Sequence, residues 1–125
     1  MDERRKTGNE GEDAAARFLA SKGHQILDRN WRAGHLELDI VSFGDDGIHF
    51  VEVKTRRPPM QAEPQESVTA TKQKRLVKAA LAYLNRSRNP LLRDVEYHFD
   101  IVAVTFDNLG MTIGYFPDAF IPIYI

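Results

Sequence analysis

Alternation of apolar and polar residues is clearest in two short runs of the chain. Residues 36–41 read Leu-Glu-Leu-Asp-Ile-Val, and residues 49–54 read His-Phe-Val-Glu-Val-Lys. Gly-Asp-Asp-Gly, at 44–47 between them, combines residue types that favour tight turns. The pattern therefore predicts an antiparallel hairpin whose turn is centred between Asp45 and Asp46.

A turn centred there fixes the register of the hairpin. Paired residue numbers then sum to 91, so Asp39 faces Glu52 and Glu37 faces Lys54. Strand side chains alternate between the two faces of a sheet, so these four charged side chains share one face. The opposite face is apolar and suited to covering a core, with Leu38 opposite Val53 and Ile40 opposite Val51.

The pairing of Asp39 with Glu52 is the most informative feature of this hairpin. Directly opposed side chains have Cβ atoms roughly 5 Å apart, and like charges placed so are destabilising unless a cation lies between them. Paired carboxylates with a neighbouring lysine suit Mg²⁺ and a phosphate ester. The hairpin therefore indicates a divalent-metal site, with an ordinary solvent-exposed charged face as the open alternative.

Helical spacing marks the first element of the chain. Asn9 is placed to cap a helix over residues 12–22, Glu12 completes a capping-box pattern, and Gly23 is a stop signal. Glu12 also begins the apolar stripe of this helix, so its carboxylate has either a capping role or a ligand role.

Four further elements complete the expected order of the chain. They are a strand over 25–31, a helix over 67–88, a central strand over 97–106 that contains Asp100, and a strand over 111–116 that pairs with it. Prolines make residues 56–66 a long exposed loop. The apolar tail, 119–125, must pack on its own domain or meet a second subunit.

Length and composition bound the class of protein. A chain of 125 residues is one domain, 1–125, large enough to bury a core without staples. The absence of cysteine excludes disulfides and thiolate metal sites and fits a reducing cytoplasm. The charged N-terminus is not a signal peptide, and no apolar run has the length of a membrane span. We therefore expect a cytoplasmic location and no membrane partner.

Positive charge is clustered although the net charge is only −1. Local clustering, rather than net charge, decides whether a protein binds nucleic acid. The basic residues expected to contact a phosphate backbone are Arg56, Arg57, Lys72 and Arg75, whereas Lys74 and Lys78 fit a solvated helix face. Histidines at 24, 35, 49 and 98 show no metal-ligand spacing and are expected at the solvent edge or in packing, with His35 a minor candidate beside the acids.

Glu12, Glu37-x-Asp39 and Glu52-Val53-Lys54 occur in an order that resembles the PD-(D/E)-x-K nuclease superfamily. The chain is more closely similar to the YraN-type family of uncharacterised bacterial proteins, which is related to archaeal Holliday junction resolvases. The similarity extends over nearly the whole chain. Two features depart from the pattern: Leu36 stands where the family has glycine, and the proline of the superfamily's name is absent.

This resemblance implies a restriction-endonuclease-like α/β fold, with a mixed central β-sheet flanked by helices. It implies that Asp39, Glu52 and the Val53 carbonyl hold Mg²⁺ or Mn²⁺. Lys54 would orient or help deprotonate the attacking water, and Glu12 would hold metal or water from the helix. Glu37 has a supporting role beside Lys54.

The function expected first is therefore a Mg²⁺-dependent endonuclease that hydrolyses phosphodiester bonds in duplex or branched DNA. Analogy with resolvases adds a possible homodimer. Two alternatives stay open: a non-catalytic nucleic-acid-binding module with the same fold, and a protein-interaction domain whose hairpin acids are only surface charge.

Overall fold

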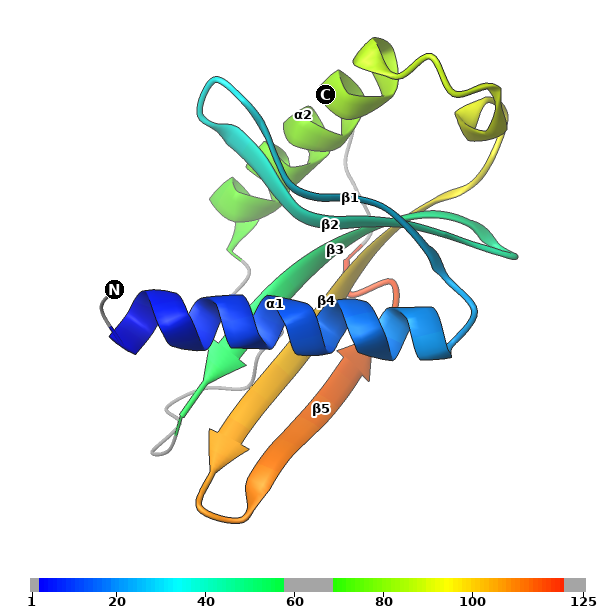
Figure 1. Ribbon diagram of the computed structural model, residues 1–125. Helices are drawn as coiled ribbons and strands as arrows, with labels where there is room; N and C mark the ends of the chain where they lie inside the picture. Colours follow the sequence, from blue (N-terminus) through cyan, green and yellow to red (C-terminus); the bar gives the residue numbers. More distant parts are fainter. Residues whose placement is uncertain (1–2, 58–68, 121–125) are drawn as a thin grey trace.

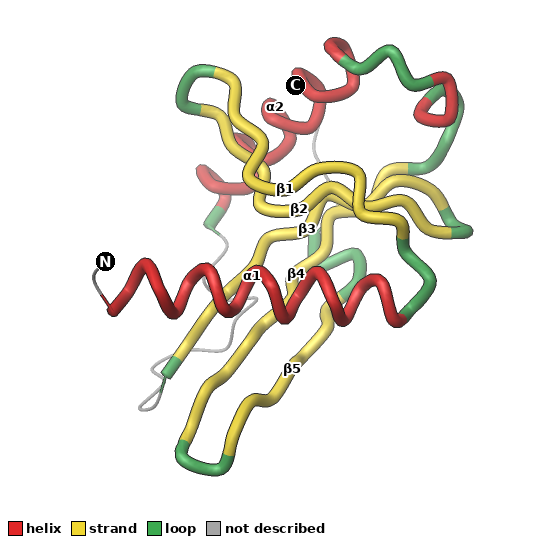
Figure 2. The backbone as a smooth tube through the Cα atoms, in the orientation of Figure 1, coloured by secondary structure: helices red, strands yellow, loops and turns green. Residues whose placement is uncertain are grey.

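The computed structural model of the chain describes residues 3–57 and 69–120, with side chains from residue 9 onward. Its centre is one five-stranded sheet in the order β1-β2-β3-β4-β5 (Figures 1 and 2). The strands are β1 (Gln25–Ala33), β2 (Leu36–Gly44), β3 (Gly47–Arg56), β4 (Tyr97–Asp107) and β5 (Gly110–Phe116). Neighbours pair antiparallel except β3 and β4, which are parallel.

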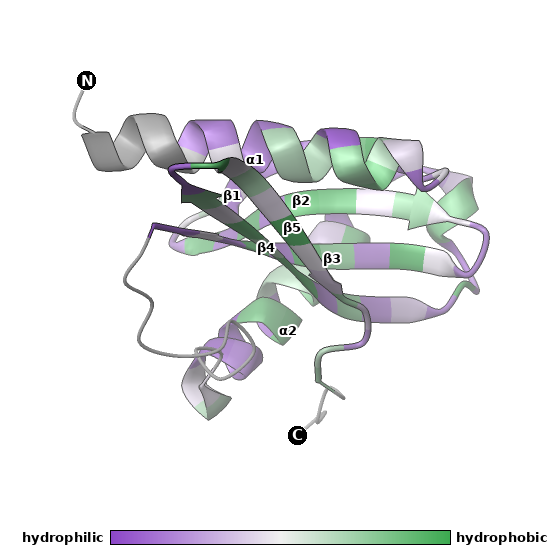
Figure 3. Cartoon of the chain, turned by 90° about the horizontal axis from the view of Figure 1, so that it is seen from below, coloured by the Kyte–Doolittle hydropathy of each residue, from purple (hydrophilic) through white to green (hydrophobic). Residues whose placement is uncertain are grey.

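Two helices cover the two faces of this sheet, so the protein has three layers (Figure 3). Helix α1 (Glu3–Ser21) packs on one face through Ala15 and Leu19. Helix α2 (Ala70–Arg86) packs on the other, and with the 3₁₀ helix η2 (Pro90–Leu92) it leads from β3 to β4. A parallel pair of strands requires such a crossover. The expected α/β arrangement, a mixed central sheet flanked by helices, is confirmed.

The predicted register of the β2–β3 hairpin is confirmed near its turn. Pairs run from Gly44 with Gly47 to Ile40 with Val51, and each pair sums to 91. The described ladder ends there. Beyond Ile40, β2 stays paired with β1 as far as Leu36, whereas β3 stays paired with β4 as far as Arg56. The two strands of the hairpin therefore diverge.

This divergence corrects two expectations about the hairpin. The backbone pairs of Asp39 with Glu52 and of Glu37 with Lys54 are not part of the ladder. The prediction of one continuous apolar face on the hairpin is also wrong. Ile40 packs in the core under α1, whereas Leu38 packs in the core under α2. The register of β1 on β2 shifts between Ile26 and Asp28, and such bulges bend a strand and increase its twist.

The start of the first helix is earlier than predicted. Helix α1 begins at Glu3, so Asn9 lies inside the helix and does not cap it, and Glu12 has no capping role. Gly11 faces β3 so closely that a Cβ added there would meet the Thr55 side chain. Gly23, with a φ of +92°, ends the helical segment as predicted. Glycine adopts this conformation without the steric cost that other residues incur.

The predictions for the second helix, the loop before it and the C-terminal tail fall only partly on the described residues. Thr69 caps α2 by accepting from the Lys72 N–H at 3.2 Å, and the helix ends at Arg86 rather than 88. Its expected start at 67, most of the 56–66 loop and residues 121–125 of the tail lie outside the described part. Ala119 and Phe120, which open that tail, pack against the core under α2, so this part of the tail lies on its own domain. Met111 to Phe116 pairs with β4, as predicted.

The helices that the structure describes include none long and apolar enough to cross a membrane.

Candidate active site

The open end of the hairpin gathers carboxylates around Asp39. Burial raises the pKa of Asp39 to about 7, and the negative charge of Glu52 is the next largest cause. Glu12 on α1 and Glu37 on β2 add smaller contributions in the same direction. The Val53 N–H donates to Asp39 Oδ2 at 2.9 Å, which opposes the rise but does not cancel it. Negative charge at Asp39 is therefore disfavoured without a cation.

Glu52 on β3 is held by two lysines. Its Oε1 lies 2.5 Å from Lys72 Nζ and 3.4 Å from Lys54 Nζ, and its side chain is only 11% exposed. Burial and the neighbouring Lys72 together lower the pKa of Lys54, against the attraction of Glu52. Burial also acts to lower the pKa of Lys72, but its hydrogen bonds with Glu52 and Lys54 raise it overall. Lys54 is thus the lysine closer to losing its proton.

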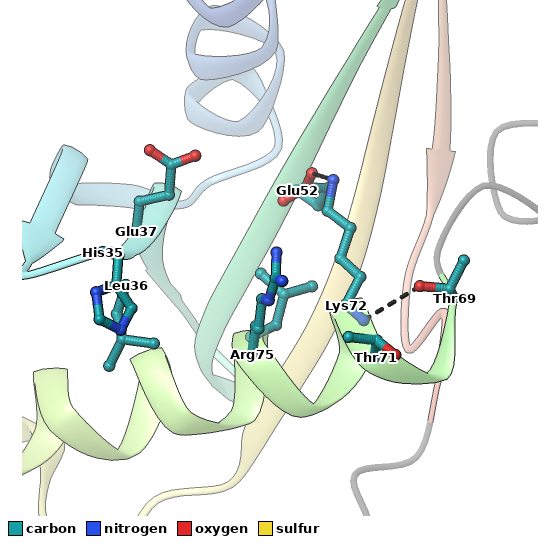
Figure 4. A pocket seen from close by; sticks show the side chains of 9 residues that line it. His35, Leu36, Glu37, Glu52, Thr69, Thr71, Lys72 and Arg75 are labelled. Carbon is teal, nitrogen blue, oxygen red and sulfur yellow. Dashed lines mark hydrogen bonds and ion pairs between the residues drawn. The ribbon is translucent and has the colours of Figure 1, made fainter.

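A cavity of about 340 Å³ lies between the open end of the hairpin and the start of α2. In Figure 4, Lys72 extends from α2 to Glu52, and Arg75 projects from the next turn of the same helix. Of the predicted site residues, Glu37 and Glu52 line the cavity from the sheet and Lys72 and Arg75 line it from α2, whereas Asp39 is not part of the lining. The full lining is His35, Leu36, Glu37, Glu52, Thr69, Thr71, Lys72, Arg75 and Leu76.

Three of the predicted site residues have their described contacts outside the Glu52–lysine group. Glu37 lines the cavity, but its carboxylate pairs with Arg32 at 3.5 Å on an exposed surface instead of facing Lys54. The guanidinium of Arg57 lies 5.2 Å from the centre of the Phe106 ring. Arg56 Nε is buried and has no hydrogen-bond partner among the described residues. Arg56 and Arg57 extend β3 beyond Lys54 and do not line the cavity.

Asp39, Glu52 and Glu12 do not meet as a compact trio of ligand atoms. Within the described ranges, the one group of three His, Asp or Glu side chains whose ligand atoms all lie within 4.8 Å is Asp46, His49 and His98. This second cluster occupies the turn end of the hairpin. Its two imidazoles and one carboxylate are donor groups that bind metal ions in proteins.

The histidine cluster rests on buried Asp100 of β4. Burial alone would raise the pKa of Asp100, but hydrogen bonds from His49 and Tyr115 and from the Asp118 N–H lower it. Burial acts to lower the pKa of His49, but its hydrogen bonds with Asp100 and Asp46 raise it overall. Sequence reasoning placed the histidines at the solvent edge or in packing, and His49 is buried within an ion-pair network instead. The signal available was Asp100, a charged residue inside an otherwise apolar strand.

Comparison with known proteins gives consistent relatives along most of the chain. The profile of the "Uncharacterised protein family UPF0102" matches residues 11–104. A UPF0102 protein of Myxococcus xanthus is 42% identical over 118 residues, which cover 94% of this chain and 91% of that protein. A UPF0102 protein of Bacteroides thetaiotaomicron is 41% identical over 122 residues, which cover 98% of both chains.

Among solved structures, the chain is similar to Pyrococcus furiosus SfsA in complex with Ca²⁺. The TM-score is 0.41 and the sequence identity is 16%. The similarity covers 90% of this chain and 62% of that chain, so this chain spans less than two thirds of the SfsA length.

Proposed function

The chain belongs to the uncharacterised protein family UPF0102, as its YraN-type resemblance predicted, and we propose that it is a divalent-metal-dependent endonuclease acting on DNA. One observation carries the proposal: burial and surrounding acids raise the pKa of Asp39 to about 7 beside Glu52. A buried carboxylate with this surrounding is destabilised in its charged form, and a divalent cation reverses that effect.

The donor set fits Mg²⁺ or Mn²⁺. Asp39 and Glu52 supply carboxylate oxygens, which these hard cations prefer, and waters complete such sites. The Val53 N–H fixes the orientation of the Asp39 carboxylate through Oδ2. From the family resemblance, we assign the Val53 carbonyl and Glu12 as further ligands to the metal or to its water.

The metal would stabilise negative charge on the phosphate and increase the acidity of a bound water. Lys54 is placed beside Glu52, and its lowered pKa suits it to hold a proton from the attacking water or to orient that water. Lys72 holds the Glu52 carboxylate in place. Arg75 in the cavity, with Arg56 and Arg57 along β3, would contact phosphates and position the nucleic acid.

One observation favours a second function. Lys72 and Lys54 already pair with Glu52, so this carboxylate does not need a metal to be neutralised. A non-catalytic nucleic-acid-binding module with this fold would keep the basic residues and lack cleavage. A steep salt dependence of DNA binding, without cleavage, is the signature of that alternative.

The test is a panel of duplex, flap, junction, gapped and single-stranded DNA substrates with Mg²⁺ or Mn²⁺. We expect cleavage of at least one substrate, lost on chelation with EDTA. Asp39→Asn and Glu52→Gln should each reduce the rate by about a hundredfold or more. Asp45→Asn is the matched control, because Asp45 is an exposed acid at the opposite end of the same hairpin.

Two outcomes would overturn the proposal. Cleavage that survives both substitutions would assign the activity to other residues or to a contaminant. Salt-sensitive DNA binding without cleavage of any substrate would establish the binding module instead.

We further propose a single domain acting in the cytoplasm. A homodimer is proposed by analogy with resolvases, which sedimentation of the full chain tests.

A further inference from the structure

Three side chains from separate elements meet at the turn end of the hairpin. Asp46 lies in the β2–β3 turn, His49 lies on β3 and His98 lies on β4. His49 and His98 are directly paired across the parallel ladder, and their rings stack with centroids 4.5 Å apart and an angle of 17°. The ligand atoms of the three side chains lie within 4.8 Å of one another.

Both imidazole rings are oriented by a carboxylate on their Nδ1 side. His49 Nδ1 lies 2.5 Å from Asp100 Oδ2, and His98 Nδ1 lies 2.8 Å from Asp118 Oδ1. The Nε2 atoms of both rings therefore face Asp46. That of His49 lies 2.6 Å from Oδ1, and that of His98 lies 2.8 Å from the Asp46 carbonyl oxygen and 3.7 Å from Oδ2. Histidines that bind metals through one ring nitrogen commonly donate the other N–H to a carboxylate in this way.

A second layer of hydrogen bonds supports His49. Asp100 has a side chain with 0% exposure, and it accepts from the Tyr115 hydroxyl at 2.6 Å and from the Asp118 N–H at 2.9 Å. These hydrogen bonds hold the Asp100 carboxylate in place, and that carboxylate in turn orients the His49 ring. The arrangement has the features of a built site: two oriented imidazoles, a carboxylate ligand and a second layer of hydrogen bonds.

We propose that Asp46, His49 and His98 bind a divalent transition-metal ion of the Zn²⁺ class, separate from the Asp39–Glu52 site. Two nitrogens and one carboxylate oxygen suit Zn²⁺ and similar ions, whereas Mg²⁺ prefers oxygen ligands alone. Three protein ligands leave a position for water or for Glu96, whose Oε2 lies 3.8 Å from His98 Nε2.

Binding requires each Nε2 to give up its proton and its present contact, with Asp46 Oδ1 for His49 and with the Asp46 carbonyl oxygen for His98. Metal–ligand bonds of about 2.0–2.2 Å need the ligand atoms about 3–4 Å apart. The Asp46 side chain is 59% exposed and already contacts His49, so a change of its rotamer can bring it onto an ion held by the buried His49 ring and the half-buried His98 ring. The ion would tie the β2–β3 turn to β4 and, through Asp118, to the segment after β5. Its role in this position is structural.

The experiment uses the full chain without an affinity tag, stripped of metal by EDTA and dialysed. Zn²⁺ is titrated by calorimetry, and the Tm is followed in parallel. We expect one ion per chain, a Tm higher by several degrees and no displacement by millimolar Mg²⁺. Asp46→Asn and His98→Gln should each weaken binding at least tenfold, whereas Asp45→Asn and His35→Gln should bind as wild type does.

Asp39→Asn separates this proposal from the nuclease proposal, because Zn²⁺ binding is measured without DNA or cleavage. Unchanged affinity in Asp39→Asn is expected. The proposal is overturned if wild type binds no Zn²⁺, if Asp46→Asn and His98→Gln bind it equally well, or if Asp39→Asn abolishes binding. Asp46 is exposed, so Asp46→Asn remains a fair test even if His98→Gln fails to fold.

Discussion

Asp39 on β2 and Asp100 on β4 lie on either side of β3 in the same sheet, and their surroundings shift their pKa values in opposite directions. Around Asp100, a histidine, a tyrosine hydroxyl and a backbone N–H stabilise the charged form and lower its pKa. Around Asp39, burial and neighbouring carboxylates outweigh one backbone N–H and raise its pKa. The Asp100 carboxylate stabilises the fold when charged, whereas that of Asp39 destabilises it.

The backbone pairing of β2 with β3 also differs between the turn end and the open end of the hairpin. The turn end of β2 and β3 is paired up to the Gly44–Gly47 closure, whereas the open end has lost its ladder beyond Ile40. Groups destabilised in the free protein are common where a ligand is to bind, because binding then relieves the cost. The comparison therefore supports stability at one end and chemistry at the other.

The largest expected change in the free energy of unfolding comes from substituting Asp100. Asp100→Asn should lower the free energy of unfolding by about 3 kcal/mol, because it leaves His49 without its buried counter-charge. Urea denaturation measures the change. Asp107→Asn, an exposed acid on the same strand, is the control and should change stability little. Equal effects of the two substitutions would remove the distinction drawn for Asp100.

At the open end the same substitution should act in the opposite direction. The pKa of Asp39 is raised to about 7 from a usual 3.8, so folding retains a proton that the unfolded chain loses. Stability from this group therefore falls as pH rises from about 4 to about 7. Asp39→Asn should raise the free energy of unfolding by about 2 kcal/mol at pH 8 and by little at pH 4.

Mg²⁺ provides the internal check on Asp39. It should raise the Tm of wild type at pH 8 and leave that of Asp39→Asn unchanged, because the metal binds only the folded charged site. If Asp39→Asn is more stable than wild type by the same amount at pH 4 and at pH 8, the charge of Asp39 is not what destabilises the wild-type protein.

Gly11 connects α1, and with it Glu12, to the open end. Gly11→Ala should destabilise the protein by about 1–2 kcal/mol, because the new methyl group meets the Thr55 side chain. Thermal or urea unfolding measures it. The cost should shrink in a Thr55→Ala background, where the nearest obstructing atom, Oγ1, and Cγ2 are removed. The same cost in both backgrounds would mean that the close approach is not its cause.

The smallest effect concerns the two lysines on Glu52. Lys72→Met removes a positive charge beside Lys54, so the pKa of Lys54 should rise from its lowered value. NMR titration of the lysine side chains measures it. Lys74→Met, on an exposed position of the same helix, should leave it unchanged. A Lys54 pKa that stays low without Lys72 would show that burial, the largest cause, acts without help from Lys72.

The success of the hairpin prediction has a clear limit. The turn residues determine the register near the turn, so pairs such as Ile40 with Val51 followed from local sequence. The divergence beyond Ile40 depends on how β1 and β4 compete for pairing with β2 and β3, which is a tertiary effect. The prediction at the helix start failed for a local reason: the turns before Asn9 are helical, so its capping pattern was not used.

The histidine cluster lay beyond sequence reasoning for a different reason. His49 and His98 are far apart along the chain, and only the register of the parallel β3–β4 pair brings them opposite each other. Parallel register is set by the crossover through α2, which no turn motif encodes. Lys72 was predicted to contact a phosphate backbone, and in the structure its ammonium contacts Glu52.

The parallel pairing of β3 with β4 also has a consequence for how the chain folds. In the β1–β2–β3 meander and the β4–β5 hairpin, the paired strands follow each other along the chain. The β3–β4 pair instead joins residues far apart in sequence, such as Ile48 and Tyr97. Closing a long segment costs chain entropy before its contacts form, so we expect this docking to limit the folding rate. A chain still being synthesised therefore cannot complete the histidine cluster until β4 has emerged and docked.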